Sequence, residues 1–169
     1  MPGIQARQQR PARLRIAMVT ETYPPEVNGD ARTLGRFVDG LRKRDHSVQL
    51  VRPRQHRSER AAAACEFEEF LVPGLPIPRY SHLRIGLPAK NALLHAWTGR
   101  RPDLVHIATE GPLGWSALSA AKALDLPVSS AFHTNFHAYS SHYGADWLAS
   151  AIEAYLRRFH NRADCTAVP

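Results

Sequence analysis

Three segments of the sequence carry polar side chains directly after apolar runs. Asn28 and Gly29 precede a helical pattern. Backbone N–H groups at a helix start can hold a phosphate, and a glycine lets a ligand approach the backbone. Glu110 lies between a strand-like run and a helix start, where it either accepts hydrogen bonds from a sugar hydroxyl or caps the helix. The third segment, "FHTNFHAYSSHYG" from Phe132, has the mixture of imidazoles, amide and aromatic rings that is typical of a carbohydrate site.

Other chemistries agree less well with these segments. Gly29 lacks the further spaced glycines of a dinucleotide fingerprint or a Walker loop, and ordinary turn chemistry is the alternative explanation of Asn28 and Gly29. His133 and His137 would share one face of a helix, but the sequence has no HExxH and no third ligand at a suitable spacing. We therefore predict neither a metal site nor a cofactor.

The elements that must position these segments alternate between strands and helices. Apolar runs predict strands at residues 15–21, 47–53, 68–74, 103–110, 127–134 and 165–169. Helical patterns follow Asp30, which we expect to be a cap, and occupy residues 89–100, 115–126 and 147–160. Residues 54–66 are expected to form a mobile loop, and the prolines of residues 75–88 exclude a regular helix.

The alternation predicts an α/β fold, Rossmann-like and doubly wound, with a mainly parallel sheet. We expect one domain over residues 14–169 after a disordered basic tail at residues 1–13. Ligands of such sheets bind beyond the carboxyl ends of the strands. The three polar segments are therefore predicted to meet at one edge, with Gly29, Glu110 and His133 close together.

The charge and the apolar content limit the partners. The formal net charge is +7 and arginines concentrate between Arg42 and Arg60, which suits anionic lipid or phosphorylated substrates but also an ordinary solvated surface. The sequence has no zinc-finger spacing and no RRM-like motif, so we do not predict nucleic acid binding. No run of about 18 apolar residues and no secretion signal is present, which places the protein in the cytoplasm.

Taken together, the segments resemble a known family. "RIAMVTETYPPEVNGDARTLGRFVDGL", "RPDLVHIATEGPLGWSALSAAKALDLPV" and "SAFHTNFHAYSSHYG" are similar to the N-terminal domain of retaining glycosyltransferases with the GT-B fold, glycosyltransferase family four. The bacterial GDP-mannose-dependent α-mannosyltransferases and their glycolipid-forming relatives look nearest. The resemblance implies transfer of a hexose, with mannose expected, from GDP-mannose or a UDP-sugar to a hydroxyl of a lipid or glycan acceptor. It also implies that the C-terminal donor domain is absent, so this chain alone is expected to be inactive or nearly so.

The resemblance also implies roles for single residues. Asn28 and Gly29 match the family's loop near the donor diphosphate, although Asp30 stands where many members have a second glycine. His133 in "FHTNF" matches the histidine that contacts the transferred sugar. The side chains expected on the acceptor side are Glu110, Tyr139, Tyr80, His82 and Arg84. No metal is implied, because the family generally needs none.

Two other classes of protein stay open. A nucleotide-dependent dehydrogenase should show GxGxxG and an acidic residue after the second strand, where this chain has Arg52 and Arg54. A non-catalytic α/β module would instead use the basic loop to bind an anionic membrane or ligand, such as the inner face of the membrane. Salt-sensitive vesicle binding that survives loss of His133 would favour that module.

Overall fold

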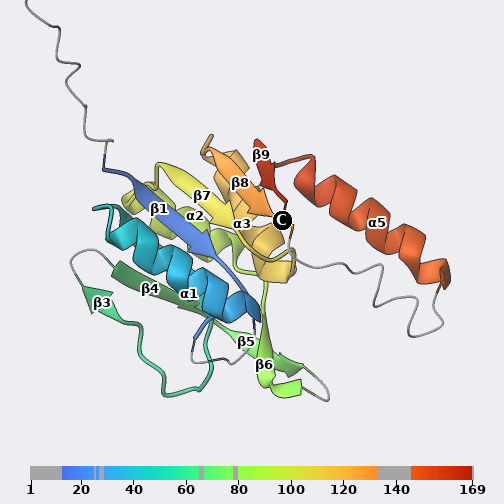
Figure 1. Cartoon of the computed structure of the whole chain (residues 1–169), viewed down its shortest axis with the longest axis horizontal. Coiled ribbons are helices and arrows are strands. Elements are labelled where there is room, and N and C mark those ends of the chain that lie inside the picture. Colours follow the sequence, from blue (N-terminus) through green and yellow to red (C-terminus); the bar gives the residue numbers. More distant parts are fainter. Residues whose placement is uncertain are drawn as a thin grey trace, which may run out of the picture.

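A seven-stranded sheet forms the centre of the protein (Figure 1). The computed structural model describes residues 13–24, 26, 29–64, 67–77, 80–132 and 146–168, with the backbone alone for 80–82 and 146–149. The strand order is β3-β4-β2-β1-β7-β8-β9. The strands are β1 (Arg15–Val19), β2 (Ser47–Pro53), β3 (Ala63–Ala64), β4 (Phe67–Val72), β7 (Leu104–Ile107), β8 (Val128–Ala131) and β9 (Cys165–Ala167). All neighbours pair in parallel except β3 with β4, which confirms the mainly parallel Rossmann-like sheet.

The central strands end level with one another. Val19 at the end of β1 pairs with Val51 of β2 on one side and with Ile107 of β7 on the other. After their first residues, β1 and β2 are buried on both faces, as parallel strands between two helical layers are. The segments that follow β1 and β7 consequently start from the same edge of the sheet.

Helices cover both faces of the sheet. They are α1 (Gly29–Arg42), α2 (Lys90–Gly99), α3 (Pro112–Ala123) and α5 (Asp146–His160). On one face, α1 packs Leu34 and Val38 against a cluster that includes Met18 of β1. On the other, α2 and α3 share a larger cluster with Ala17 and with Phe159 of α5. Complete burial of one such large apolar side chain contributes about 1.5–3 kcal/mol.

A hairpin of β5 (Gly74–Ile77) and β6 (Tyr80–Gly86) stands apart from the main sheet (Figure 1). Strand β6 contacts both β2 and α3, which holds the hairpin near the carboxyl ends of the central strands. The Leu87 N–H donates to the Pro73 carbonyl at 2.8 Å and closes the base of the hairpin. The prediction that this proline-rich stretch is not helical is confirmed, but the sequence did not predict its strand pairing.

Three local predictions differ from the structure. Part of the expected loop at residues 54–66 forms β3, because Ala63 and Ala64 pair with Glu68 and Phe67 of β4. Asp30 does not precede the first helix but lies in its first turn, where the helix dipole still favours a carboxylate. Helix α3 begins at Pro112 instead of residue 115, since proline is well suited to the first helical position.

In the part of the chain that the structure describes, no helix is long and apolar enough to cross a membrane.

Candidate functional site

A cavity of about 490 Å³ lies at the carboxyl edge of the sheet, bounded by the hairpin, the start of α3 and helix α5. Its walls are mainly aliphatic, and its few polar groups include two carboxyl groups and one guanidinium group. The lining residues are Glu21, Ile77, Arg84, Ile85, Thr109, Glu110, Gly111, Pro112, Ile152, Tyr155 and Leu156. They come from segments far apart in the sequence, which only the fold brings together.

Glu21 supplies one of the two carboxyl groups. It follows β1, and its carboxylate accepts hydrogen bonds from the N–H of Gly86, at the end of β6, and from the N–H of Leu113, at 3.3 Å. Its own N–H donates to Thr109 Oγ1 at 2.9 Å. Burial raises the pKa of Glu21 to about 7, even though the two backbone donors favour the charged form.

Glu110 supplies the other carboxyl group and holds α5 against the sheet. The residue is only 6% exposed, and its Oε1 lies 3.2 Å from His160 Nε2. The other ring nitrogen, Nδ1, lies 2.9 Å from Ser130 Oγ. The Tyr155 hydroxyl donates to the backbone carbonyl of Glu110. Two side chains of α5 therefore bind the same residue at the end of β7.

Burial disfavours charge on both members of the Glu110–His160 pair. It raises the pKa of Glu110 to about 7, and the nearby charge of Asp30 acts in the same direction. Burial also lowers the pKa of His160. Burial therefore favours the uncharged form of each member of this pair.

The start of α3 is capped from another part of the chain. Its cap residue is Gly111, which has no side chain to bind the first-turn amides. Glu21 instead accepts the hydrogen bond of Leu113. The capping role that the sequence allowed for Glu110 thus belongs to Glu21, which sequence reasoning missed. Glu21 could have been found from the sequence, because it is an acidic residue that follows an apolar strand. The same pattern drew attention to Glu110.

The structure brings several of the predicted site residues to this edge. Gly29 begins α1, the helix that follows β1, so it lies on the carboxyl side of that strand but does not line the cavity. Among the described residues, a Cβ added at Gly29 would meet no atom within 4 Å, so their packing does not require a glycine there. Arg84 lines the cavity, with one guanidinium nitrogen donating to the Gly74 carbonyl at 3.2 Å.

The remaining candidates cannot be placed by side chain. Tyr80 and His82 lie in β6, for which the structure gives their backbone position. Asn28, His133 and Tyr139 lie outside the described residues. Gly29 and Glu110 follow the neighbouring strands β1 and β7, and the convergence of Gly29, Glu110 and His133 at one site stays a prediction.

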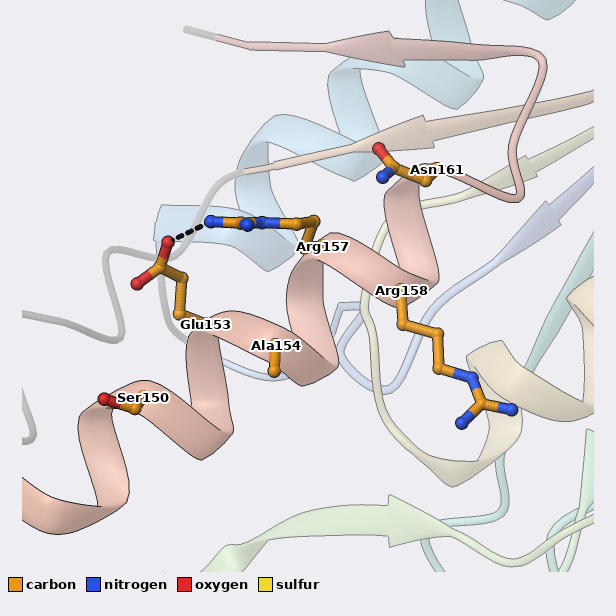
Figure 2. A pocket seen from close by; sticks show the side chains of 6 residues that line it. All are labelled: Ser150, Glu153, Ala154, Arg157, Arg158 and Asn161. Carbon is orange, nitrogen blue, oxygen red and sulfur yellow. Dashed lines mark hydrogen bonds and ion pairs between the residues drawn. The ribbon is translucent and has the colours of Figure 1, made fainter.

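A second hollow of about 390 Å³ follows one face of α5 (Figure 2). Its lining side chains are those of Ser150, Glu153, Ala154, Arg157, Arg158 and Asn161. Arg157 forms an ion pair with Glu153 one turn earlier, and Arg158 points away from that pair. The two partners of this ion pair are well exposed, at 68% and 50%, which is typical of a solvated helix face.

Comparison with known proteins identifies the family. The sequence profile of Glycosyltransferase Family 4 matches residues 27–169. This chain belongs to glycosyltransferase family 4. The family 4 chain is 31% identical over 158 residues to a GDP-mannose-dependent alpha-mannosyltransferase of Mycolicibacterium smegmatis, covering 92% of this chain and 42% of the relative. The enzyme of the same name from Mycobacterium tuberculosis is also 31% identical, over 160 residues, with the same two coverages.

A solved structure shares the fold of this family 4 chain. It is that of a putative UDP-N-acetylglucosamine 2-epimerase from Listeria monocytogenes, with a TM-score of 0.50 and 11% identity. The match covers 94% of this chain and 40% of the other. At this identity the likeness concerns the α/β architecture alone.

No three His, Cys, Asp or Glu side chains among the described residues of the family 4 chain are grouped so that they could hold a metal ion. The charged groups at the cavity are instead single side chains from separate elements. The chemistry open to them is hydrogen bonding to hydroxyl groups and electrostatic positioning.

Proposed function

We propose that this chain forms the acceptor side of a retaining glycosyltransferase. The enzyme transfers a hexose, with mannose from GDP-mannose as the first choice, to a hydroxyl of a lipid or glycan. The observation that carries the proposal is the cavity at the carboxyl edge of β1 and β7, which is lined by the half-buried carboxyl group of Glu21 and the buried carboxyl group of Glu110. Membership of family 4 and two GDP-mannose-dependent relatives agree with it.

The donor approaches the start of α1. A helix N-terminus favours negative charge, and the open space at Gly29 allows a diphosphate to come close to the backbone. In this proposal Asn28 and Gly29 contact the diphosphate and His133 contacts the transferred sugar. Transfer breaks the bond from the anomeric carbon to the diphosphate oxygen, forms a bond to the acceptor oxygen on the same face, and moves the proton of the acceptor hydroxyl to the leaving diphosphate. Positive groups and N–H donors stabilise the charge that develops on the diphosphate.

The acceptor occupies the cavity itself. Glu110 and Arg84 are the described polar groups that we assign to it, together with Tyr80, His82 and Tyr139. The side chains of Ile77, Ile85, Ile152 and Leu156 make most of the wall aliphatic. Such a wall favours an acceptor with an apolar chain beside its hydroxyl group, so we expect a lipid acceptor rather than a free glycan.

Transfer also requires residues beyond those present here. This chain spans 42% of the length of the two mannosyltransferases that it matches. We expect the 169-residue chain alone to transfer no hexose above background and to become active when joined to the rest of the M. smegmatis enzyme.

The joined protein allows the decisive assay. Transfer is measured with GDP-mannose, UDP-glucose and UDP-glucuronate, each offered with an alkyl mannoside and with a free mannose oligosaccharide as acceptors. We expect GDP-mannose and the alkyl mannoside to give the highest kcat/KM. The variant His133→Ala should lower transfer at least tenfold. Transfer that is unchanged in His133→Ala would show that the sugar-contacting role is wrongly assigned.

A second candidate function is binding to an anionic membrane. Arg54, Arg57 and Arg60 are exposed in the loop after β2, and Leu75 of the neighbouring β5 is 54% exposed. The Arg54 N–H donates to the Val72 carbonyl at 2.9 Å, which places the start of this loop beside the hairpin. Arginines beside an exposed leucine match the charge and the apolar interior of an anionic bilayer.

Vesicle flotation tests this candidate. Binding to vesicles rich in anionic lipid should fall with salt, and it should weaken about fivefold for each of these arginines changed to Gln. Arg101→Gln, which removes an arginine from a turn after α2, is the matched control. Binding that persists in His133→Ala while transfer is lost would separate the membrane role from catalysis.

A further inference from the structure

Glu21 joins three segments that form different walls of the cavity. Its backbone continues β1, its Oε2 accepts the N–H of Gly86 at the end of β6, and its Oε1 accepts the N–H of Leu113 in the first turn of α3. A further bond, from its own N–H to Thr109, ties it to the segment after β7. Each oxygen of this one carboxyl group thus holds a different element.

The surrounding glycines leave room for the carboxyl group. A Cβ added at Gly111 would collide with Glu21 Oε1, and one at Gly86 would lie 3.0 Å from Oε2 and 2.8 Å from the Leu113 Cβ. Any larger residue at Gly111 would therefore displace the carboxyl group from the start of α3. Because Gly86 and Gly111 have no side chains, the carboxyl group of Glu21 fits against both of them. This fit fixes where the backbone at Gly86 and the backbone at Gly111 lie.

Both carboxylate oxygens of Glu21 already accept backbone hydrogen bonds, which favours a positioning role over a catalytic role. An acceptor hydroxyl would compete with backbone donors at either oxygen, whereas the carboxylate of Glu110 has a side chain, His160, as its partner. We propose that Glu21 is a positioning residue of this cavity, which fixes the end of β1, the end of β6 and the first turn of α3 relative to one another. The contacts exist without donor or acceptor, so they can be tested even if the proposed transferase function fails.

The bond to Leu113 gives a direct readout. Pro112 has no N–H, so the Leu113 amide is the first donor of α3, and a helix offers no internal acceptor to it. The rate at which the Leu113 amide exchanges its hydrogen with solvent therefore depends on its hydrogen bond to Glu21. The Gly86 amide lies at the far end of β6 and reports independently on the hairpin.

Several titratable groups lie around the carboxyl group of Glu21, and the experiment needs control variants that separate their effects from its own. Glu26 from the same loop acts on it electrostatically, and Glu110 and Arg84 line the same cavity. Tyr155 faces it from α5. Because burial raises the pKa of both Glu21 and Glu110 to about 7, their titrations have to be separated by variants.

Amide NMR of the 169-residue chain carries out the test. The Gly86 and Leu113 amide signals should shift with a midpoint near pH 7, and the shift should vanish in Glu21→Gln but persist in Glu110→Gln. In Glu21→Ala, hydrogen exchange at these two amides should be at least tenfold faster, while the Val105 amide, which donates to Pro127, keeps its rate. Gly111→Ala should accelerate exchange at Leu113 by displacing the carboxyl group.

Glu26→Gln is the matched control, because it removes a carboxylate from the same loop that bonds to the side chains of Thr22 and Gln55. It should leave exchange at both reporter amides unchanged. A pH-dependent shift that persists in Glu21→Gln, or unchanged exchange in Glu21→Ala and Gly111→Ala, overturns the proposal. If Glu21→Ala does not fold, the titration of Glu21→Gln alone decides the question.

Discussion

At the scale of single residues, Gly29 is a position where the requirements of packing can be compared with those of ligand binding. No atom of the residues that the structure describes lies within 4 Å of a Cβ placed there, and Gly29 is the first residue of α1. Helix propensity favours alanine over glycine, so the fold gains nothing from glycine at this position. The proposed approach of the donor to the backbone would give a reason for a glycine here.

Gly29→Ala should therefore impair donor binding without loss of stability. In the protein joined to the rest of the M. smegmatis enzyme, we expect KM for GDP-mannose to rise about tenfold, equal to about 1.4 kcal/mol. The thermal midpoint should stay the same or rise slightly. Gly99→Ala is the control, because a Cβ at Gly99 also meets open space but lies at the end of α2. Equal KM values in the two variants would contradict a donor contact at Gly29.

The candidate site could be predicted only in part at this scale. Glu110 was found because an acidic residue after an apolar run lies at the functional edge of a parallel sheet. Glu21 carries the same local signal, but its two carboxylate partners lie 65 and 92 residues away, and no local pattern reveals such contacts. The pairing of Glu110 with His160 spans 50 residues and was missed for the same reason.

At the scale of elements, α5 is attached by its C-terminal half. Phe159 is fully buried in the main core cluster, and it packs edge-to-face on Trp115 of α3 with ring centroids 5.2 Å apart. Tyr155 and His160 add hydrogen bonds to Glu110. Apolar burial therefore provides most of the docking energy, and the polar contacts fix how the helix lies.

If apolar burial attaches α5, Phe159→Ala should lower the stability of the protein more than Tyr155→Phe. Phe159→Ala should lower the free energy of unfolding by about 3–5 kcal/mol, because it leaves a cavity in the core. Tyr155→Phe removes one hydrogen bond from a partly exposed side chain and should cost about 1 kcal/mol. Urea unfolding followed by circular dichroism gives both values. A larger loss in Tyr155→Phe than in Phe159→Ala would mean that the polar clamp, and not burial, attaches α5.

Element boundaries show which patterns sequence reasoning can use. Strand β2 was predicted to the residue, because a segment rich in valine and leucine ends at a proline. The β5–β6 hairpin was missed, since prolines within a run argue against a strand in a central position but are tolerated where no neighbour needs the missing N–H. Its pairing depends on contacts with β2 and α3 that the local sequence does not show.

At the scale of the whole molecule, the alternation of strands and helices was sufficient to predict the layered sheet. A parallel pair requires a crossover, and crossovers place helices on the faces of the sheet. The alternation does not give the position of the hairpin or of α5, which close the cavity on two sides. The fold class was therefore readable from the sequence, whereas the shape of the site was not.

Two carboxyl groups with raised pKa values make the stability of the whole molecule depend on pH. The pKa values of Glu21 and Glu110 are raised from 4.5 to about 7 in the folded protein, so between these values the folded state binds more protons than the unfolded state. The stabilisation is complete below about pH 4.5 and is lost as the pH rises through 7. Burial lowers the pKa of His160 from its ordinary value of 6.5, so below that value the unfolded state binds more protons than the folded state. The contribution of His160 to stability therefore rises with pH.

The free energy of unfolding should accordingly decrease between pH 5 and 7, with a limiting slope of about 1.4 kcal/mol per pH unit for each carboxyl group. Glu59 and Asp164 have lowered pKa values, so their contributions change below about pH 4.5 and leave this window untouched. Urea unfolding at several pH values measures the slope. Glu21→Gln and Glu110→Gln should each flatten it, and the double variant should lose the part of the decrease that these two carboxyl groups cause. A wild-type stability that rises from pH 5 to 7 would mean that these two carboxyl groups are charged at neutral pH, and the cavity would then carry two negative charges beside the site of the donor diphosphate.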